Sequence, residues 1–201
     1  MPKATFLNLS SSKKQRILEI LLQNFSNRHM QVKVADIVEG MGMSRGAFYK
    51  YFEDLEDAYT YTIHHYSIYV YHNILKSISN NQKNFFQGIE SYLAWCTTLD
   101  RSSSDWLAIQ LLTKSNDVST QKRITSSSES KMLKEWFKLL EMNDFSIKNE
   151  DEALSFLYFV MELIIQSLTD FITNDWTNEQ LLQDFHYKVK WLTSGLTKKE
   201  K

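Results

Sequence analysis

The sequence predicts an all-α protein of about nine helices. The 201 residues contain one proline, Pro2, and five glycines, so little in the chain interrupts a helix. Apolar side chains recur at intervals of three and four along most of the chain, the spacing that gives a helix one buried face. With 43% hydrophobic and 13% aromatic residues the chain can build its own core, which excludes a disordered or fibrous protein.

Three short helices are predicted near the N-terminus, over about residues 12–25, 34–40 and 45–51. Gly42 follows the second as a residue that tolerates positive φ, and Ser44 is placed to cap the third. A glycine turn between two short helices is typical of a helix-turn-helix, whose last helix enters the major groove of DNA. The residues expected to hold the three helices together are Ile17, Leu21, Val34, Ile37, Phe48 and Phe52.

Longer helices follow, over about residues 55–79, 83–98, 105–113, 150–173 and 178–194, with a further helix that ends near residue 140. Ser104 and Asn149 are placed to cap two of them. The start of the helix near residue 140 is not set, because residues 125–130 are polar. We therefore expect a head over residues 1–54 and a larger helical domain over residues 55–201.

The formal net charge of −1 conceals an uneven distribution. Residues 1–52 carry eight basic and three acidic residues, or +5, whereas residues 53–201 carry 15 and 21, or −6. A basic segment joined to an acidic one indicates that only the first meets a polyanion. On charge alone, a solvated surface without a partner is an equal alternative.

The motif around the glycine turn resembles the DNA-binding head of the tetracycline-repressor (TetR) family of bacterial transcription regulators. The resemblance covers about residues 14–59 and is best over 34–52. The residues that carry it are Ile37, Gly42, Ser44, Gly46, Tyr49 and Phe52. It implies a helical ligand-binding and dimerisation domain after the head, which agrees with the chain length and with the two long final helices.

The resemblance also implies roles for single residues on the third helix. Those expected to face base edges or neighbouring phosphates, after Ser44 at the helix start, are Arg45, Gly46, Ala47 and Lys50. Tyr49 and Tyr51 are expected to bind phosphate through their hydroxyls, although a core tyrosine is the alternative reading of Tyr49.

Among the departures from the family pattern, two bear directly on phosphate contacts. Lys33 stands where a capping threonine often contacts phosphate, and a lysine can still reach the DNA backbone. Leu55 replaces the lysine that usually follows the third helix, so one phosphate contact is in doubt.

The resemblance implies a small molecule enclosed between the helices of the second domain, and the aromatic residues there would suit an apolar or aromatic effector. The alternative is ordinary core. The candidates, including two polar groups, are Tyr66, Phe86, Tyr92, Trp95, Cys96, Trp106, Gln110, Trp136 and Phe137.

The helix over residues 150–173 is apolar nearly all round, so it must be covered on two sides. A second copy of the chain best explains the outer cover, in a two-fold four-helix interface with the final helix. The residues expected there are Phe156, Val160, Ile164, Leu168, Leu181, Phe185, Val189 and Leu192.

Other classes of protein find little support in the sequence. His64, His65, His72 and His186 have no metal-site spacing, and no nucleophile–base pair is evident, so we expect neither a metal or cofactor nor an enzyme. One cysteine, no signal peptide and no run of about 18 apolar residues favour a cytoplasmic protein without a membrane partner.

We therefore expect a homodimeric, ligand-responsive transcription regulator. Its partner is a pseudo-palindromic DNA operator, from which a small molecule releases it by moving the helix that starts near Leu55. Repression is the expected sign of control. The alternative is an adaptor or activator that works through a protein partner.

Overall fold

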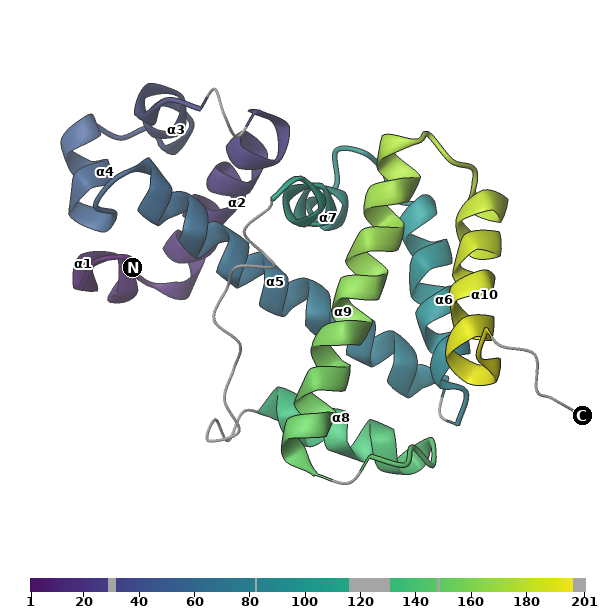
Figure 1. Ribbon diagram of the computed structural model, residues 1–201. Coiled ribbons are helices and arrows are strands. Elements are labelled where there is room, and N and C mark those ends of the chain that lie inside the picture. Colours follow the sequence, from purple (N-terminus) through teal and green to yellow (C-terminus); the bar gives the residue numbers. More distant parts are fainter. Residues whose placement is uncertain (29–31, 82, 116–130, 148, 197–201) are drawn as a thin grey trace, which may run out of the picture. The chain divides into compact units, whose positions relative to one another are not determined.

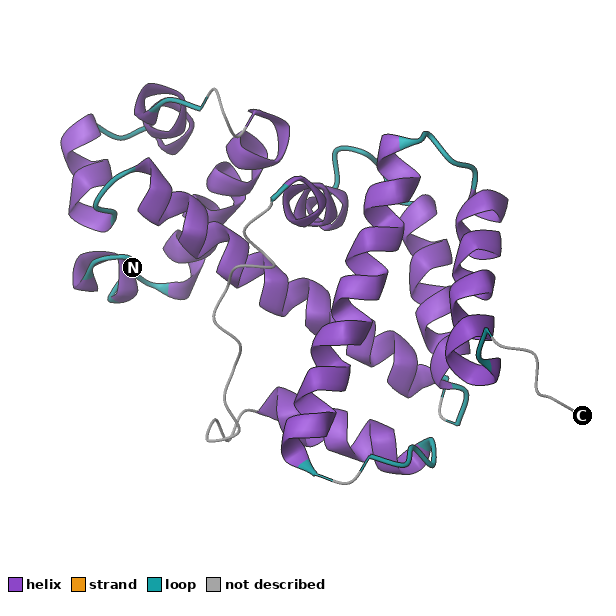
Figure 2. Ribbon diagram, in the orientation of Figure 1, coloured by secondary structure: helices purple, strands orange, loops and turns teal. Residues whose placement is uncertain are grey.

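The computed structural model describes residues 1–28, 32–81, 83–115, 131–147 and 149–196. These residues form ten helices and no strand, which confirms the all-α prediction (Figures 1 and 2). The helices are α1 (Ala4–Leu7), α2 (Ser11–Arg28), α3 (Val34–Met41), α4 (Arg45–Tyr51), α5 (Leu55–Asn80), α6 (Phe85–Thr97), α7 (Ser104–Lys114), α8 (Lys131–Met142), α9 (Glu150–Thr173) and α10 (Asn178–Ser194).

Local capping chemistry explains where several helices begin. Asn149 accepts a hydrogen bond from the backbone N–H of Glu152 at 2.9 Å, so it caps α9 as predicted. The cap of α7 is Ser103 rather than Ser104, because the Ser103 hydroxyl accepts the Trp106 N–H at 3.2 Å. The polar stretch 125–130, which left the start of α8 undecided, lies outside the described residues.

The short helix α1 is not among the helices predicted from the sequence. The described residues therefore contain ten helices, where about nine are expected. Four residues are too few to show helical periodicity, so no local signal distinguishes them from a loop. The helix exists because Phe6, with 0% of its surface exposed, is buried against later parts of the chain.

The chain divides into two compact units. Unit 1 contains residues 1–70 and 100–115, and thus α1 to α4, the first part of α5 and α7. Within it, α7 packs along α2, and α3 packs on both α2 and α4. Five of the six residues expected to hold the head together are buried, and Val34 is half-buried. The predicted head, residues 1–54, lies wholly in unit 1.

Unit 2 contains the remainder of α5 from Tyr71, together with α6, α8, α9 and α10. Here α10 packs on α6 and on α9. At the centre of one aromatic cluster Trp136 has 0% exposure, and its Nε1–H donates to the Ala153 carbonyl at 2.8 Å. The rings of Phe85 and Phe156 pack on it, and Phe145 packs on Phe85.

Among the described residues, α9 alone has the length and composition to cross a membrane, with a hydropathy of 1.4 over its most apolar window. Val160, Ile164 and Leu168 on this helix are each at most 1% exposed inside the protein. An apolar helix with buried residues is equally typical of a protein core, so α9 is no evidence of a membrane protein.

Candidate nucleic-acid interface

The turn between α3 and α4 has the backbone geometry that a helix-turn-helix requires. Gly42 ends α3 with φ 62°, a left-handed conformation that costs glycine little. Its N–H donates to the Glu39 carbonyl at 3.0 Å, and the Met43 N–H reaches back to Val38 at 2.9 Å. These bonds satisfy carbonyls at the end of α3, and the chain then enters α4 at the predicted cap position, Ser44.

Helix α4 presents two chemically different faces. Phe48 is 0% exposed, and Phe52 directly after the helix is also 0% exposed, so one face is anchored in unit 1. Arg45, Gly46 and Lys50 are exposed on the other face. A short helix with one anchored face and one exposed basic face is suited to insertion into a groove of DNA.

Three further predicted residues have the accessibility that a DNA contact requires. Tyr49 is 48% exposed, and its hydroxyl has no partner among the described residues. This placement favours the phosphate-binding reading of Tyr49 over the core reading. The Ser44 hydroxyl makes no capping hydrogen bond and is exposed, and Ala47 is half-buried on the same helix.

Tyr51 is much less exposed than Tyr49. The residue is 6% exposed, and its ring packs edge-on to Phe6 at a centroid distance of 6.0 Å. Most of this side chain therefore lies in the core, and the phosphate contact expected of its hydroxyl stays a prediction. The sequence gives no indication of this burial, because tyrosine is common both in protein cores and on protein surfaces.

Lys33 lies at the N-cap of α3 with an exposed side chain. Its backbone N–H donates to the Asp36 carboxylate at 3.0 Å, so Asp36 supplies a capping bond that the lysine side chain does not. The lysine ammonium thus stays available for a phosphate.

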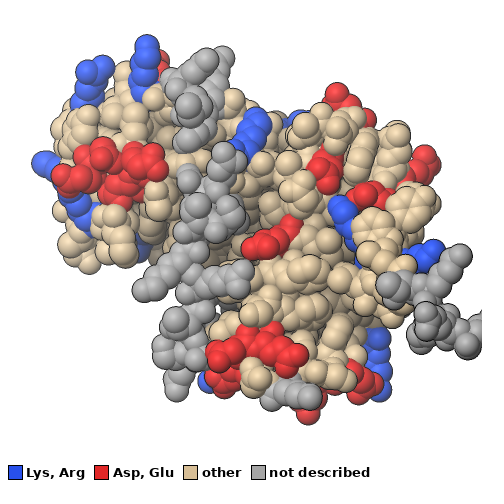
Figure 3. Space-filling view, in the orientation of Figure 1, with Lys and Arg blue, Asp and Glu red and all other residues tan. Residues whose placement is uncertain are grey.

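The acidic residues that follow α4 accept backbone hydrogen bonds at the start of α5. Asp57 accepts the Glu53 N–H at 3.0 Å, and Asp54 accepts the Asp57 N–H at 2.8 Å. Carboxylates at a helix N-terminus are stabilised by its dipole. Figure 3 shows acidic and basic side chains side by side on one face of unit 1.

The predicted effector residues are divided between the units. Tyr66, Trp106 and Gln110 belong to unit 1, and the other six, Phe86, Tyr92, Trp95, Cys96, Trp136 and Phe137, belong to unit 2. Five of the nine are core residues that are at most 4% exposed, namely Tyr66, Tyr92, Cys96, Trp106 and Trp136, whereas Trp95 is 38% exposed. The pKa of Tyr66 is raised to about 12, mainly by burial and to a smaller extent by the charges of Glu19 and Tyr69.

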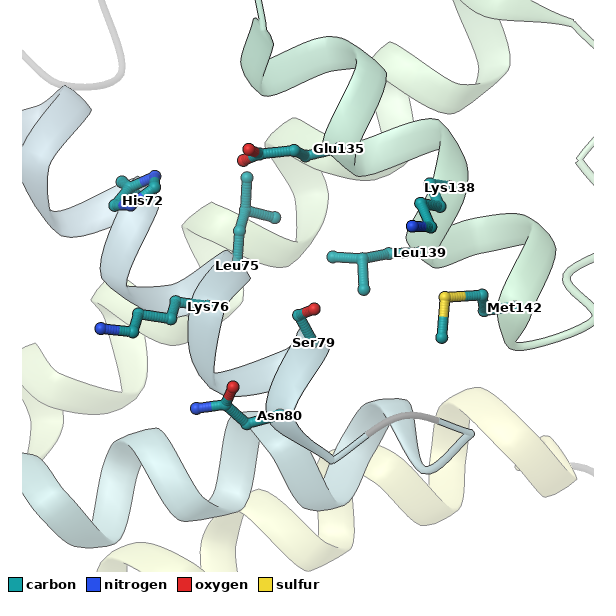
Figure 4. Close-up of a pocket in the computed structure, with 9 residues that line it drawn as sticks. All are labelled: His72, Leu75, Lys76, Ser79, Asn80, Glu135, Lys138, Leu139 and Met142. Carbon is teal, nitrogen blue, oxygen red and sulfur yellow. The ribbon is translucent and has the colours of Figure 1, made fainter.

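A groove of about 450 Å³ lies in unit 2 between the last turns of α5 and helix α8 (Figure 4). Leu75 and Leu139 point into the space between the two helices. Lys76 on α5 and Lys138 on α8 flank this apolar floor, and neither makes a hydrogen bond or ion pair with another described residue. The remaining lining residues are His72, Ser79, Asn80, Glu135 and Met142.

None of the nine predicted effector residues lines this groove. Sequence reasoning missed it because a lysine on the polar face of a helix is ordinarily a solvated surface charge. Only the pairing of α5 with α8, some 60 residues apart in the chain, brings the two lysines to one site.

The residues predicted for the dimer interface fall into two groups, one buried within the chain and one accessible. Val160, Ile164, Leu168, Leu181 and Phe185 are at most 1% exposed, so the structure uses them in the core of the chain itself. Phe156 and Val189 are half-buried, and Leu192 is 44% exposed. Other apolar residues on the same two helices are accessible, namely Phe159 at 41%, Tyr187 at 51% and Trp191 at 47% exposure.

Comparison with known proteins found a family model and solved structures that are similar to this chain. Residues 84–196 match the family model of the tetracyclin repressor-like C-terminal domain. A TetR family transcriptional regulator from Chloroflexus aurantiacus J-10-FL is 20% identical, with 95% of this chain and 90% of that chain covered and a TM-score of 0.44. The transcriptional regulator FadR from Bacillus subtilis, solved with stearoyl-CoA, is 16% identical, with 91% and 99% covered and a TM-score of 0.48. No curated protein matches the chain.

The family match covers more than half of the chain, from α6 to the end of α10. The chain therefore belongs to the TetR family of transcription regulators. Its members bind DNA through a helix-turn-helix and carry a helical domain for ligands. The α3–α4 hairpin is the corresponding element in this chain.

Proposed function

We propose that the protein is a homodimeric transcriptional repressor that binds a pseudo-palindromic operator and is released by a small molecule. The observation that carries this proposal is the division of α4 into an anchored face with Phe48 and an exposed face with Arg45, Tyr49 and Lys50. Residues 1–54 form the DNA-binding domain, and residues 55–201 the ligand-binding and dimerisation domain, of a cytoplasmic regulator.

On DNA, contacts with base edges and contacts with phosphates have different roles. Arg45 and the small residues Gly46 and Ala47 lie near the start of α4, the part of a recognition helix that meets base edges. Tyr49, Lys50 and Lys33 bind phosphates and so set the register of the helix on the duplex. Each cationic phosphate contact releases counterions, so affinity falls as salt rises.

The dimer forms through the outer surfaces of α9 and α10. Phe159, Tyr187, Trp191 and Leu192 leave more than 40% of their surfaces exposed, which is a large apolar area for these two helices. A second copy that covers them buries this surface and pairs two heads, about one helical turn of DNA apart.

The effector binds in the groove between α5 and α8. An apolar floor between two lysines that have no partner among the described residues fits an amphipathic anion, with an apolar body on Leu75 and Leu139 and a carboxylate or phosphate at Lys76 or Lys138. Helix α5 begins directly after the helix-turn-helix and ends at the groove, so one element is common to both sites. The effector acts only if its affinity differs between the DNA-bound and released states.

The DNA-binding part is tested with a duplex that the wild-type protein selects from a random-sequence pool. We expect Arg45→Ala to weaken binding by about tenfold or more, and Tyr49→Phe to weaken it less, since it removes one hydroxyl. The matched control is Lys83→Ala, which removes an exposed cation of unit 2. Wild-type affinity for both α4 variants, or a flat salt response, contradicts the assignment of the head.

The groove is tested by thermal shift with dodecanoate and with uncharged dodecanol. Dodecanoate should stabilise the wild type more than dodecanol does, and Lys138→Met should abolish the difference. Lys134→Met is the control, because Lys134 is exposed on the same helix but does not line the groove. Equal shifts for all variants, or a preference for uncharged aromatic ligands, point instead to the aromatic residues predicted from the sequence.

One feature favours the alternative of an activator or adaptor with a protein partner, namely Leu55 in the place of a phosphate-binding lysine. Whether the protein represses or activates is decided by deleting its gene. Transcription is then measured from the promoter nearest to the genomic copy of the selected sequence. Increased transcription supports repression, and decreased transcription supports activation.

A further inference from the structure

The N-terminal helix α1 packs on the end of the DNA-reading helix α4, and one aromatic side chain anchors it. Phe6 is 0% exposed. Its ring centroid lies 5.0 Å from that of Phe52, 5.3 Å from Tyr61 and 6.0 Å from Tyr51. Phe6 therefore joins α1 to the last residue of α4 and to the first turns of α5.

Lys3, just before α1, completes the same contact with its backbone and its side chain. Its backbone N–H donates to the Tyr51 carbonyl at 2.8 Å, and its Nζ donates to the Tyr49 carbonyl at 3.0 Å. The last carbonyls of a helix have no partner within the helix and carry the negative end of its dipole. A single lysine thus satisfies two carbonyls at the C-terminal end of α4, one through its backbone N–H and one through its charged ammonium.

Helix α4 depends on such external contacts because it has only seven residues. Helices of this length are unstable in isolation, so their position is set by what packs on them. The Gly42 turn holds the start of α4, and α1 holds its end. The two bonds from Lys3 go to the carbonyls of Tyr49 and Tyr51, on either side of the exposed Lys50.

We propose that residues 3–9 form a clamp that fixes the position of α4 for DNA binding, with Phe6 and Lys3 as positioning residues. This inference rests on the proposed operator binding, but it adds a requirement outside the helix-turn-helix. The Lys3 ammonium is engaged with α4, and it also pairs with Glu53 at 3.1 Å. It acts through the position of α4 rather than by contact with phosphate.

The test compares two neighbouring alanine variants in the full-length protein. Phe6→Ala removes the buried ring, and Leu7→Ala is the matched control, because Leu7 lies on the same helix and is 47% exposed. Two quantities are measured, namely amide hydrogen exchange in α4 of the free protein and the Kd for the selected duplex.

We expect Phe6→Ala to speed exchange in α4 by about tenfold or more, and to weaken DNA binding by a similar factor. Exchange in α9 and the dimeric state should not change. Leu7→Ala should match the wild type in both measurements, and Phe6→Leu, which refills most of the space, should restore them largely. Unchanged exchange in α4, or equal effects of Phe6→Ala and Leu7→Ala, overturns the clamp.

Lys3→Met provides a second test if Phe6→Ala does not fold, because it keeps the packing of α1 and removes only the ammonium. The clamp predicts faster exchange at the end of α4, weaker binding and an unchanged salt dependence. A salt slope reduced by about one counterion shows that Lys3 binds phosphate directly and overturns the proposal for this residue. If the wild type selects no duplex, the proposed function fails, while the exchange measurements still decide the clamp.

Discussion

Gly88 on α6 lies directly against the backbone of Ile78 on α5. A Cβ atom built on Gly88 would come within 2.4 Å of the Ile78 Cα, a distance that real side chains do not reach. The neighbouring Ser77 hydroxyl donates to the Gly88 carbonyl at 2.9 Å. The two helices therefore cross at a point where only a hydrogen atom fits.

This contact predicts that Gly88→Ala destabilises unit 2. The new methyl group meets backbone atoms, so the helices must separate, at a cost of about 1–3 kcal/mol or more. Urea unfolding measures the loss, and Gln87→Ala, an exposed change on the same helix, is the control. Equal stability of the two variants would show that α5 and α6 are not held this closely.

Gly46→Ala should have opposite effects on stability and on DNA binding. Gly46 is exposed within α4, and the nearest atom to an added Cβ is the Ser44 hydroxyl at 3.8 Å. Alanine therefore fits the free protein and stabilises the helix by about 0.5–1 kcal/mol. If Gly46 faces the duplex, the methyl group hinders approach and the Kd for the selected duplex rises. An unchanged Kd would place Gly46 away from the DNA.

Ser103→Ala should destabilise the protein and Ser104→Ala should not. The Ser103 hydroxyl caps α7 through the Trp106 N–H, and loss of such a cap costs about 1 kcal/mol. Ser104 is the first residue of the helix and is exposed. Thermal unfolding of the two variants compares them directly. A larger effect at Ser104 would restore the assignment made from the sequence.

His65 should make the protein less stable as the pH falls below 6.5. Burial, and then the charge of His64, lower the pKa of His65 in the folded protein from its ordinary value of 6.5. Between the lowered and the ordinary pKa the unfolded chain binds more protons than the folded protein does. The free energy of unfolding therefore rises with pH across that window, and the contribution of His65 is complete above it. His65→Asn should flatten this slope relative to the wild type, with pH 8 as the common reference. An unchanged slope contradicts the predicted burial effect.

The local sequence was sufficient to predict most helices and the helix-turn-helix. Apolar periodicity sets the faces of α9 and α10, Asn149 caps α9 through its own backbone neighbours, and Gly42 supplies the left-handed turn. These features depend on residues within a few positions of one another, so they can be identified without knowledge of the rest of the fold.

Tertiary structure alone decided which partner covers each apolar face. Phe6 is buried by Tyr51, Phe52 and Tyr61, which makes α1 a helix and places Tyr51 in the core. Likewise Ile164 is buried within the chain while Phe159 on the same helix stays exposed, and Lys76 and Lys138 meet at one groove. Periodicity shows that a helix has an apolar face, but burial depends on contacts between distant segments, and these exist only once the chain has folded.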